Sequence, residues 1–138
     1  MKKIILLIIF CLLSLTCHHI KPFKSDYSFV NEPPTYESVY KLCVYYQVKY
    51  PEIVCAQAIL ETGHFTSKNC KIKNNLFGLY DSKNRKYYEF DHWAHSIIAY
   101  KNKIQYKYKG GDYYKFLNRI GYATDPSYIN KLKEIQRS

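Results

Sequence analysis

The stretch that decides the fold is residues 56–63, Ala-Gln-Ala-Ile-Leu-Glu-Thr-Gly. Apolar residues recur with helical spacing from Ile53 to Leu60, and Gly63 is a favoured left-handed stop after the last turn. We therefore expect Glu61 on the final turn of a mostly buried helix. The negative end of the helix dipole and the apolar surroundings would both disfavour ionisation of its carboxyl group. A carboxyl group that stays protonated near neutral pH suits a general acid, whereas the plain alternative is a helix-end glutamate in water.

Helix-start signals occur at five places along the chain, at Thr35, Pro51, Asp91, Asp112 and Asp125. Thr and Asp favour the N-cap position, and proline favours the first turn. Glycines provide the matching stops, at 110–111 for the helix that follows Asp91 and at Gly121 for the one that follows Asp112. The sequence thus predicts five helices.

Two segments lie between the second and third of these helices. Residues 64–73 show no periodicity and are expected to form a loop, whereas the Tyr-rich residues 79–90 have a polar centre and indicate a short β-hairpin. The predicted fold class is therefore mainly α, with one short β-hairpin.

The N-terminus carries the features of an export signal. Met1-Lys2-Lys3 precedes an apolar run from Ile4 to Leu15 that is short for a membrane span, so residues 1–17 are interpreted as a signal peptide. Cys17 follows Leu-Thr in a relaxed lipoprotein cleavage box and is the predicted lipidation site, with ordinary signal cleavage as the alternative. Residues 18–34 are predicted to be a tether, and residues 35–138 a single domain. The predicted location is the cell envelope, either membrane-anchored or periplasmic.

Charge and cysteine content limit the partners. The formal net charge is +10, which favours an anionic polymer. For an exported protein that polymer is cell-wall material, teichoic acid or a lipid surface rather than nucleic acid, although the charge can also serve solubility alone. Beyond the leader, Cys43, Cys55 and Cys70 allow at most one disulfide bond within the chain. No metal site or cofactor is expected, since no standard zinc spacing is present. The protein is expected to be a monomer.

Three stretches in register carry a resemblance to a known family: Glu61–Gly63, Asn74–Gly78 and Gly121–Pro126. In this order and spacing they resemble the glucosaminidase family of bacterial cell-wall hydrolases, which includes the flagellar peptidoglycan hydrolase and the autolysin glucosaminidases. The similarity covers roughly residues 39–135. It implies a lysozyme-like helical domain, a mannosyl-glycoprotein endo-β-N-acetylglucosaminidase-like domain, with a cleft between the helical body and the hairpin lobe.

The resemblance also implies a division of catalytic roles. Glu61 matches the catalytic glutamate of the family, and a second carboxylate is expected in the hairpin lobe, which is short in this chain. Asp81 is the first candidate and Glu89 the weaker one. If neither reaches the cleft, the alternatives are a water that is activated less directly and the acetamido group of the substrate as an internal nucleophile. Retention and inversion of configuration both stay open.

Further residues are expected around the cleft. Tyr122 matches the tyrosine of the third motif and would orient a substrate acetamido group or water. Asn75 would form hydrogen bonds to sugar, Phe77 would stack on it unless it belongs to the core, and Tyr80 is a lesser candidate for sugar stacking.

Two functional hypotheses follow from these features. The first is an exported hydrolase that cleaves the β-1,4 bond after N-acetylglucosamine in peptidoglycan, with glycan strands as its partner and membrane attachment through the lipid at Cys17. The second is a catalytically weak or inactive cell-wall-binding lipoprotein of the same fold, suggested by the short hairpin and the basic surface.

Overall fold

The computed structural model describes residues 28–138. The expected leader, 1–17, with its lipidation site Cys17, and most of the expected tether lie outside the described residues. Within that range the chain forms six α-helices, two short 3-10 helices and one two-stranded sheet. In order these are η1 (Ser28–Asn31), α1 (Tyr36–Tyr45), α2 (Pro51–Thr62), α3 (Lys68–Lys73), β1 (Tyr80–Asp81), β2 (Lys86–Tyr87), α4 (Trp93–Lys103), η2 (Gln105–Lys107), α5 (Tyr113–Arg119) and α6 (Tyr128–Ile135).

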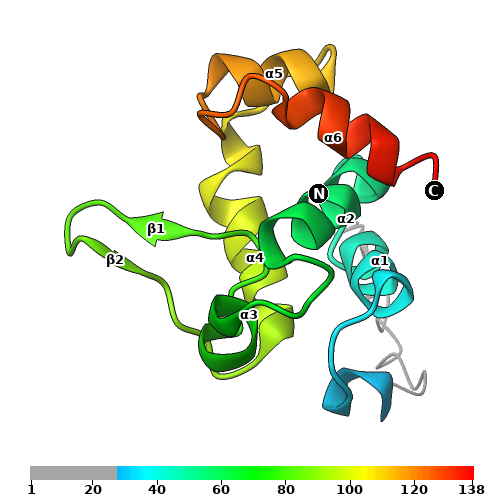
Figure 1. Cartoon of the computed structure of the whole chain (residues 1–138), viewed down its shortest axis with the longest axis vertical. Helices are drawn as coiled ribbons and strands as arrows, with labels where there is room; N and C mark the ends of the chain where they lie inside the picture. Colours follow the sequence, from blue (N-terminus) through cyan, green and yellow to red (C-terminus); the bar gives the residue numbers. More distant parts are fainter. Residues whose placement is uncertain (1–27) are drawn as a thin grey trace, which may run out of the picture.

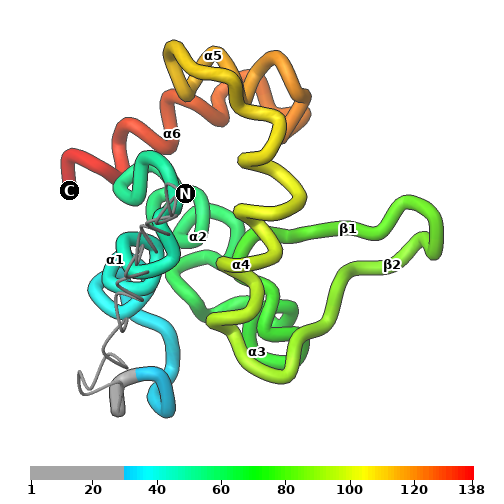
Figure 2. Tube along the Cα trace, turned by 180° about the vertical axis from the view of Figure 1, so that it is seen from behind, coloured from blue at the N-terminus to red at the C-terminus, as the bar shows by residue number. Residues whose placement is uncertain are grey.

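Helix α2 lies at the centre of the domain, with α1 on one side and α4 on the other (Figures 1 and 2). It contacts both α1 and α6, and residues 53–59 are buried without a break. A helix that is apolar around its whole circumference is stable only when other elements surround it. The predicted mainly helical fold with one small hairpin is confirmed.

Both predicted ends of α2 are confirmed. Pro51 occupies the first turn, where its missing N–H costs no hydrogen bond. Gly63 ends the helix in the left-handed conformation, with φ at 56°, and its N–H bonds back to the carbonyl of Leu60. These two signals leave Glu61 on the last turn.

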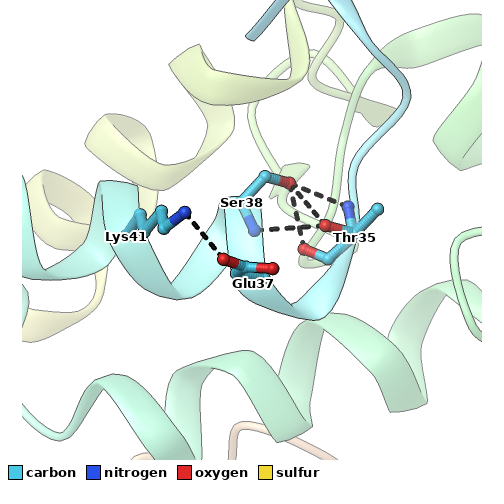
Figure 3. Close-up of polar contacts among 4 residues, drawn as sticks. All are labelled: Thr35, Glu37, Ser38 and Lys41. Carbon is cyan, nitrogen blue, oxygen red and sulfur yellow. Dashed lines mark hydrogen bonds and ion pairs between the residues drawn. The ribbon is translucent and has the colours of Figure 1, made fainter. Parts of the chain in front are cut away.

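Helix α1 begins with a capping box at Thr35, as Figure 3 shows. The Thr35 hydroxyl accepts from the Ser38 N–H at 3.1 Å, and the Ser38 hydroxyl accepts from the Thr35 N–H at 2.8 Å. Two backbone donors that a helix start leaves unpaired are thereby satisfied. An exposed ion pair between Glu37 and Lys41, 2.7 Å apart, lies one turn further on.

The helix after Asp91 differs from its prediction at both ends. His92, rather than Asp91, is the N-cap, and its ring accepts from the Ala94 N–H at 3.1 Å. The helix ends at Lys103 instead of continuing to the glycine pair. Gln105 follows in a 3-10 turn, because its side chain bonds both the N–H and the carbonyl of Lys49 in the α1–α2 connection.

Helix α3 contradicts the prediction of a loop over 64–73. Ser67 caps its start by accepting from the Cys70 N–H at 3.2 Å, and two lysines occupy its last turn, where positive charge is favourable. Six residues that bury only Cys70 are too few to show a hydrophobic period, so sequence periodicity misses this helix.

The C-terminal part agrees with prediction except at the start of α6. Asp112 caps α5 by accepting from the Lys115 N–H at 3.1 Å. The Asp125 carboxylate accepts from the Ser127 N–H at 2.8 Å and so caps a preceding turn, while the regular helix begins at Tyr128.

The predicted hairpin is present, and it extends away from the helices in both views (Figures 1 and 2). Tyr80 pairs with Tyr87 and Asp81 with Lys86 in antiparallel register. Among residues 28–138, no helix has the length and apolar character needed to cross a membrane. Cys43, Cys55 and Cys70 are buried free thiols.

We predict that Thr35→Ala lowers the free energy of unfolding by about 0.5–2 kcal/mol, because the Ser38 N–H at the helix start loses its acceptor. Denaturant unfolding followed by circular dichroism measures this loss. Glu37→Gln is the control, since it removes the neighbouring exposed ion pair and keeps the cap. Equal destabilisation by both variants would contradict the role given to the capping box.

Candidate active site

Glu61 projects from the last turn of α2 into a cleft and is reached by solvent there. Its Oε1 accepts a hydrogen bond from the Tyr128 hydroxyl of α6 at 2.9 Å. Its Oε2 faces the backbone of Gly78, where an added Cβ would lie 3.4 Å away. Two segments distant in sequence therefore hold one carboxyl group between them.

The pKa of Glu61 is raised above its ordinary value, chiefly because the surrounding protein atoms desolvate the carboxyl group. The hydrogen bond from Tyr128 acts in the opposite direction, since it stabilises the ionised form. Desolvation is the larger effect. The net direction favours the protonated acid that the sequence led us to expect.

Two cavities meet at Glu61. The larger, about 430 Å³, extends toward the hairpin and the end of α4, and the smaller, about 390 Å³, extends toward the start of α6. Glu61 and Tyr122 line both. The carboxyl group is thus placed in the middle of a groove that could hold sugar units on either side of it.

Asn75 organises the loop that approaches Glu61. Its side chain is 3 % exposed, donates to the carbonyls of Leu79 and Tyr88, and accepts from the Leu79 N–H at 3.0 Å. These bonds use the amide within the protein and shape the turn that brings Gly78 against Glu61. The geometry therefore favours a structural role for Asn75 over direct hydrogen bonding to sugar.

Phe77 and Tyr122 meet beneath the cleft. The Phe77 side chain is 2 % exposed and packs on Tyr100, with ring centroids 4.5 Å apart, so the geometry favours the core alternative for this residue. The Tyr122 hydroxyl donates to the Phe77 carbonyl at 3.0 Å, which leaves its oxygen lone pairs as acceptors. This hydrogen bond therefore connects the third motif, residues 121–126, to the second, residues 74–78.

The hairpin side of the larger cavity combines aromatic and cationic side chains. Tyr80 is exposed and packs edge-on against Tyr87. Lys103 lies over the Tyr88 ring, 4.3 Å from its centroid, and donates to the Tyr88 hydroxyl at 3.1 Å. Exposed aromatic rings suit the apolar faces of sugars, and the lysine suits an anionic substituent.

Asp81 and Glu89 are not brought to Glu61. The Asp81 carboxylate accepts hydrogen bonds from the backbone N–H groups of Lys83 and Asn84 and from the side-chain amide of Asn84, all inside the hairpin turn. The hydrogen bond from the Asn84 side chain is the main reason that the pKa of Asp81 is lowered. Glu89 pairs with Lys73 outside the cleft. Of the described residues that line the larger cavity, Glu61 alone carries a carboxyl group.

Sequence reasoning missed Tyr128 and Gly78 as contributors to this site. Tyr128 belongs to α6, sixty-seven positions from Glu61, and only the packing of α6 on α2 brings them together. Gly78 lies in the second motif, but its proximity to Glu61 has no signal in local periodicity. Among residues 28–138, no group of three or more His, Cys, Asp or Glu side chains is arranged to hold a metal ion.

A mainly helical domain with a desolvated glutamate at the centre of an open groove is typical of lysozyme-like glycoside hydrolases. The family model Glucosaminidase, described as mannosyl-glycoprotein endo-beta-N-acetylglucosaminidase, matches residues 26–138, and the chain belongs to this family. Membership indicates a glycosidase that acts on cell-wall glycans, and a location at the envelope or outside the cell. Comparison with curated proteins and with solved structures gave no significant match.

We predict that Gly78→Ala raises the pKa of Glu61 further, because the added methyl group would contact Oε2 and exclude water from it. The φ angle of 58° also strains an alanine there, at a cost of about 1 kcal/mol in stability. Carbon-13 NMR of the side-chain carboxyl groups follows the titration.

Gly121→Ala is the matched control, with φ at 62° and nothing within 4 Å of its Cβ. It should show similar destabilisation and an unchanged Glu61 titration. An unchanged titration in Gly78→Ala as well would contradict the close approach of this loop to Glu61.

Proposed function

We propose that the protein is an exported peptidoglycan hydrolase that cleaves the β-1,4 glycosidic bond after N-acetylglucosamine, with Glu61 as the general acid. The position of Glu61 carries this proposal, since it is accessible where two halves of a groove meet, and its raised pKa agrees with it. Residues 1–17 would direct export, and Cys17 would carry the lipid that attaches the protein to a membrane.

Three residues of the groove have a part in this mechanism. The glycan would lie across Glu61, with the scissile oxygen at its carboxyl group, and Glu61 would protonate that oxygen as the bond breaks. Tyr122, which lines both halves of the groove, would accept a hydrogen bond from the substrate's acetamido N–H. Tyr80 would stack against a sugar face at the hairpin end.

The candidates for the second chemical role are Asp81, a water activated less directly, and the substrate itself. The hydrogen bonds that hold Asp81 in the hairpin turn favour the substrate. In that case the acetamido carbonyl oxygen attacks the anomeric carbon while Glu61 protonates the leaving oxygen. Glu61 then takes a proton from the water that opens the cyclic intermediate, so the acid is restored.

The charges around the groove suit a wall polymer. Lys103 and Lys107 line the larger cavity and Lys131 lines the smaller one, in a chain whose formal net charge is +10. Stem-peptide carboxylates and teichoic acid phosphates carry negative charge, and a cationic rim attracts them.

Glu61→Gln should fold normally and lose at least about 1000-fold in the release of soluble fragments from purified peptidoglycan, because an amide has no acidic proton to give. Mass spectrometry of the wild-type products should find N-acetylglucosamine at the reducing ends. Undiminished cleavage by Glu61→Gln would contradict its role as the acid, and muramic acid at the reducing ends would contradict the proposed bond.

Asp81→Asn should reduce the rate of release by less than about 10-fold if the acetamido group serves as nucleophile. Glu89→Gln is the control for a change of charge in the same lobe. A loss as large as that of Glu61→Gln, confined to Asp81→Asn, would assign the second carboxylate to Asp81 instead.

The alternative function is a wall-binding lipoprotein of the same fold with weak or no activity. The specific observation in its favour is that no second carboxyl group lines the larger cavity among the described residues. It predicts that the wild-type protein sediments saturably with insoluble peptidoglycan and releases no reducing sugar.

A further inference from the structure

A line of hydrogen bonds crosses the core between η2 and α2. The Gln105 side-chain NH₂ donates to the Tyr113 hydroxyl at 2.8 Å, and the Tyr113 and Tyr100 hydroxyls lie 2.8 Å apart. The Tyr100 hydroxyl then donates to Gln57 Oε1 at 2.6 Å. All four side chains are buried, and those of Gln57 and Tyr100 are 0 % exposed.

The line continues from α2 to the catalytic carboxyl group. Gln57 Nε2 donates to the Tyr128 hydroxyl at 3.3 Å, and the Tyr128 hydroxyl donates to Glu61 Oε1 at 2.9 Å. Gln57 is one turn before Glu61 on the same helix, so both residues that bond the Tyr128 hydroxyl belong to α2.

The backbone fixes the orientation of the amide at one end of this line. Gln105 Oε1 accepts from the Lys49 N–H, and Gln105 Nε2 donates to the Lys49 carbonyl, so this amide has one orientation. Its second N–H therefore points to Tyr113. A tyrosine hydroxyl has one proton, and the Tyr100 proton is donated to Gln57 Oε1, so the hydrogen bond between the two hydroxyls is made with the Tyr113 proton.

The bond from Tyr100 also determines which side-chain group of Gln57 faces the Tyr128 hydroxyl. Because its oxygen accepts from Tyr100, its NH₂ group faces Tyr128 and supplies a donor. The Tyr128 proton is then directed away from Gln57 and onto Glu61. The reversed amide would present an oxygen to Tyr128, which would compete with Glu61 for that proton.

We propose that Gln57 is a positioning residue, which acts on Glu61 by holding the Tyr128 hydroxyl as a hydrogen-bond donor to its carboxyl group. This inference rests on the proposed function in that it concerns the acid of the reaction. The effect of Gln57 on the hydrogen bond from Tyr128 to Glu61 can be measured through the titration of Glu61, without any substrate.

The bond matters because it opposes desolvation. Desolvation raises the pKa of Glu61, and the Tyr128 donor to its ionised form lowers it, so the bond favours proton release. Other polar groups also border the same cavities, on every side of Glu61. These are Tyr80, Tyr88, Lys103 and Lys107 toward the hairpin and Tyr122, Asp125 and Lys131 toward α6.

The test is a double-mutant cycle read by carbon-13 NMR titration of Glu61. Tyr128→Phe should reduce the acid ionisation constant of Glu61 roughly three- to tenfold, because one hydrogen bond to the ionised form is lost. Gln57→Met should change it in the same direction by a smaller factor. In the Tyr128→Phe background, Gln57→Met should have no further effect.

Equal effects of Gln57→Met with and without the Tyr128 hydroxyl would overturn the proposal, as would no effect in either. If Gln57→Met does not fold, the nearly isosteric Gln57→Glu takes its place in the same cycle, since a carboxyl oxygen there offers the Tyr128 hydroxyl a competing acceptor. The direct effect of the new charge on Glu61 is present in both backgrounds, so equal reductions of the ionisation constant with and without the Tyr128 hydroxyl would overturn the proposal.

The titration separates this inference from the proposed function. If the protein releases no fragments from peptidoglycan and the cycle still gives the expected pattern, only the proposed function fails. If Glu61→Gln abolishes release but the cycle shows no coupling, only the positioning role of Gln57 fails.

Discussion

The hydrogen bond from Tyr128 to Glu61 joins α6, at the end of the chain, to α2 at its centre. An accessible carboxyl group at the end of a buried helix must be held by contacts from elsewhere in the fold. Tyr128 holds one oxygen, and the loop at Gly78 lies against the other. The packing of α6 on α2 and the shape of the second-motif loop both contribute to this arrangement.

The three motifs act together through contacts rather than through separate binding roles. The second supplies Gly78, whose turn is maintained by the buried side chain of Asn75. The third supplies Tyr122, whose hydroxyl bonds the carbonyl of Phe77 and so links both loops beneath the groove. Of the residues expected to touch sugar, Asn75 and Phe77 are buried within the protein, whereas Tyr80 and Tyr122 line the larger cavity.

How far the sequence predicted the site depended on whether the signal was local. Pro51 begins α2 and Gly63 ends it through their own backbone preferences, so the position of Glu61 on the last turn followed from the sequence alone. The short helix α3 and the His92 cap had weak local signals and were missed. Tyr128 and Gln57 could not be predicted, because their roles arise from the tertiary packing of α6 on α2 and from the direction of a buried hydrogen-bond line.

The central claim is that the fold disfavours the ionised form of Glu61. It is tested by the free energy of unfolding of the wild-type protein and Glu61→Gln as a function of pH. Since the pKa is raised in the folded state, the wild-type protein should lose stability relative to the variant as pH rises above the ordinary glutamate value of 4.5, and the difference should be independent of pH below it. A wild-type protein that gains stability relative to Glu61→Gln over that range would contradict the account.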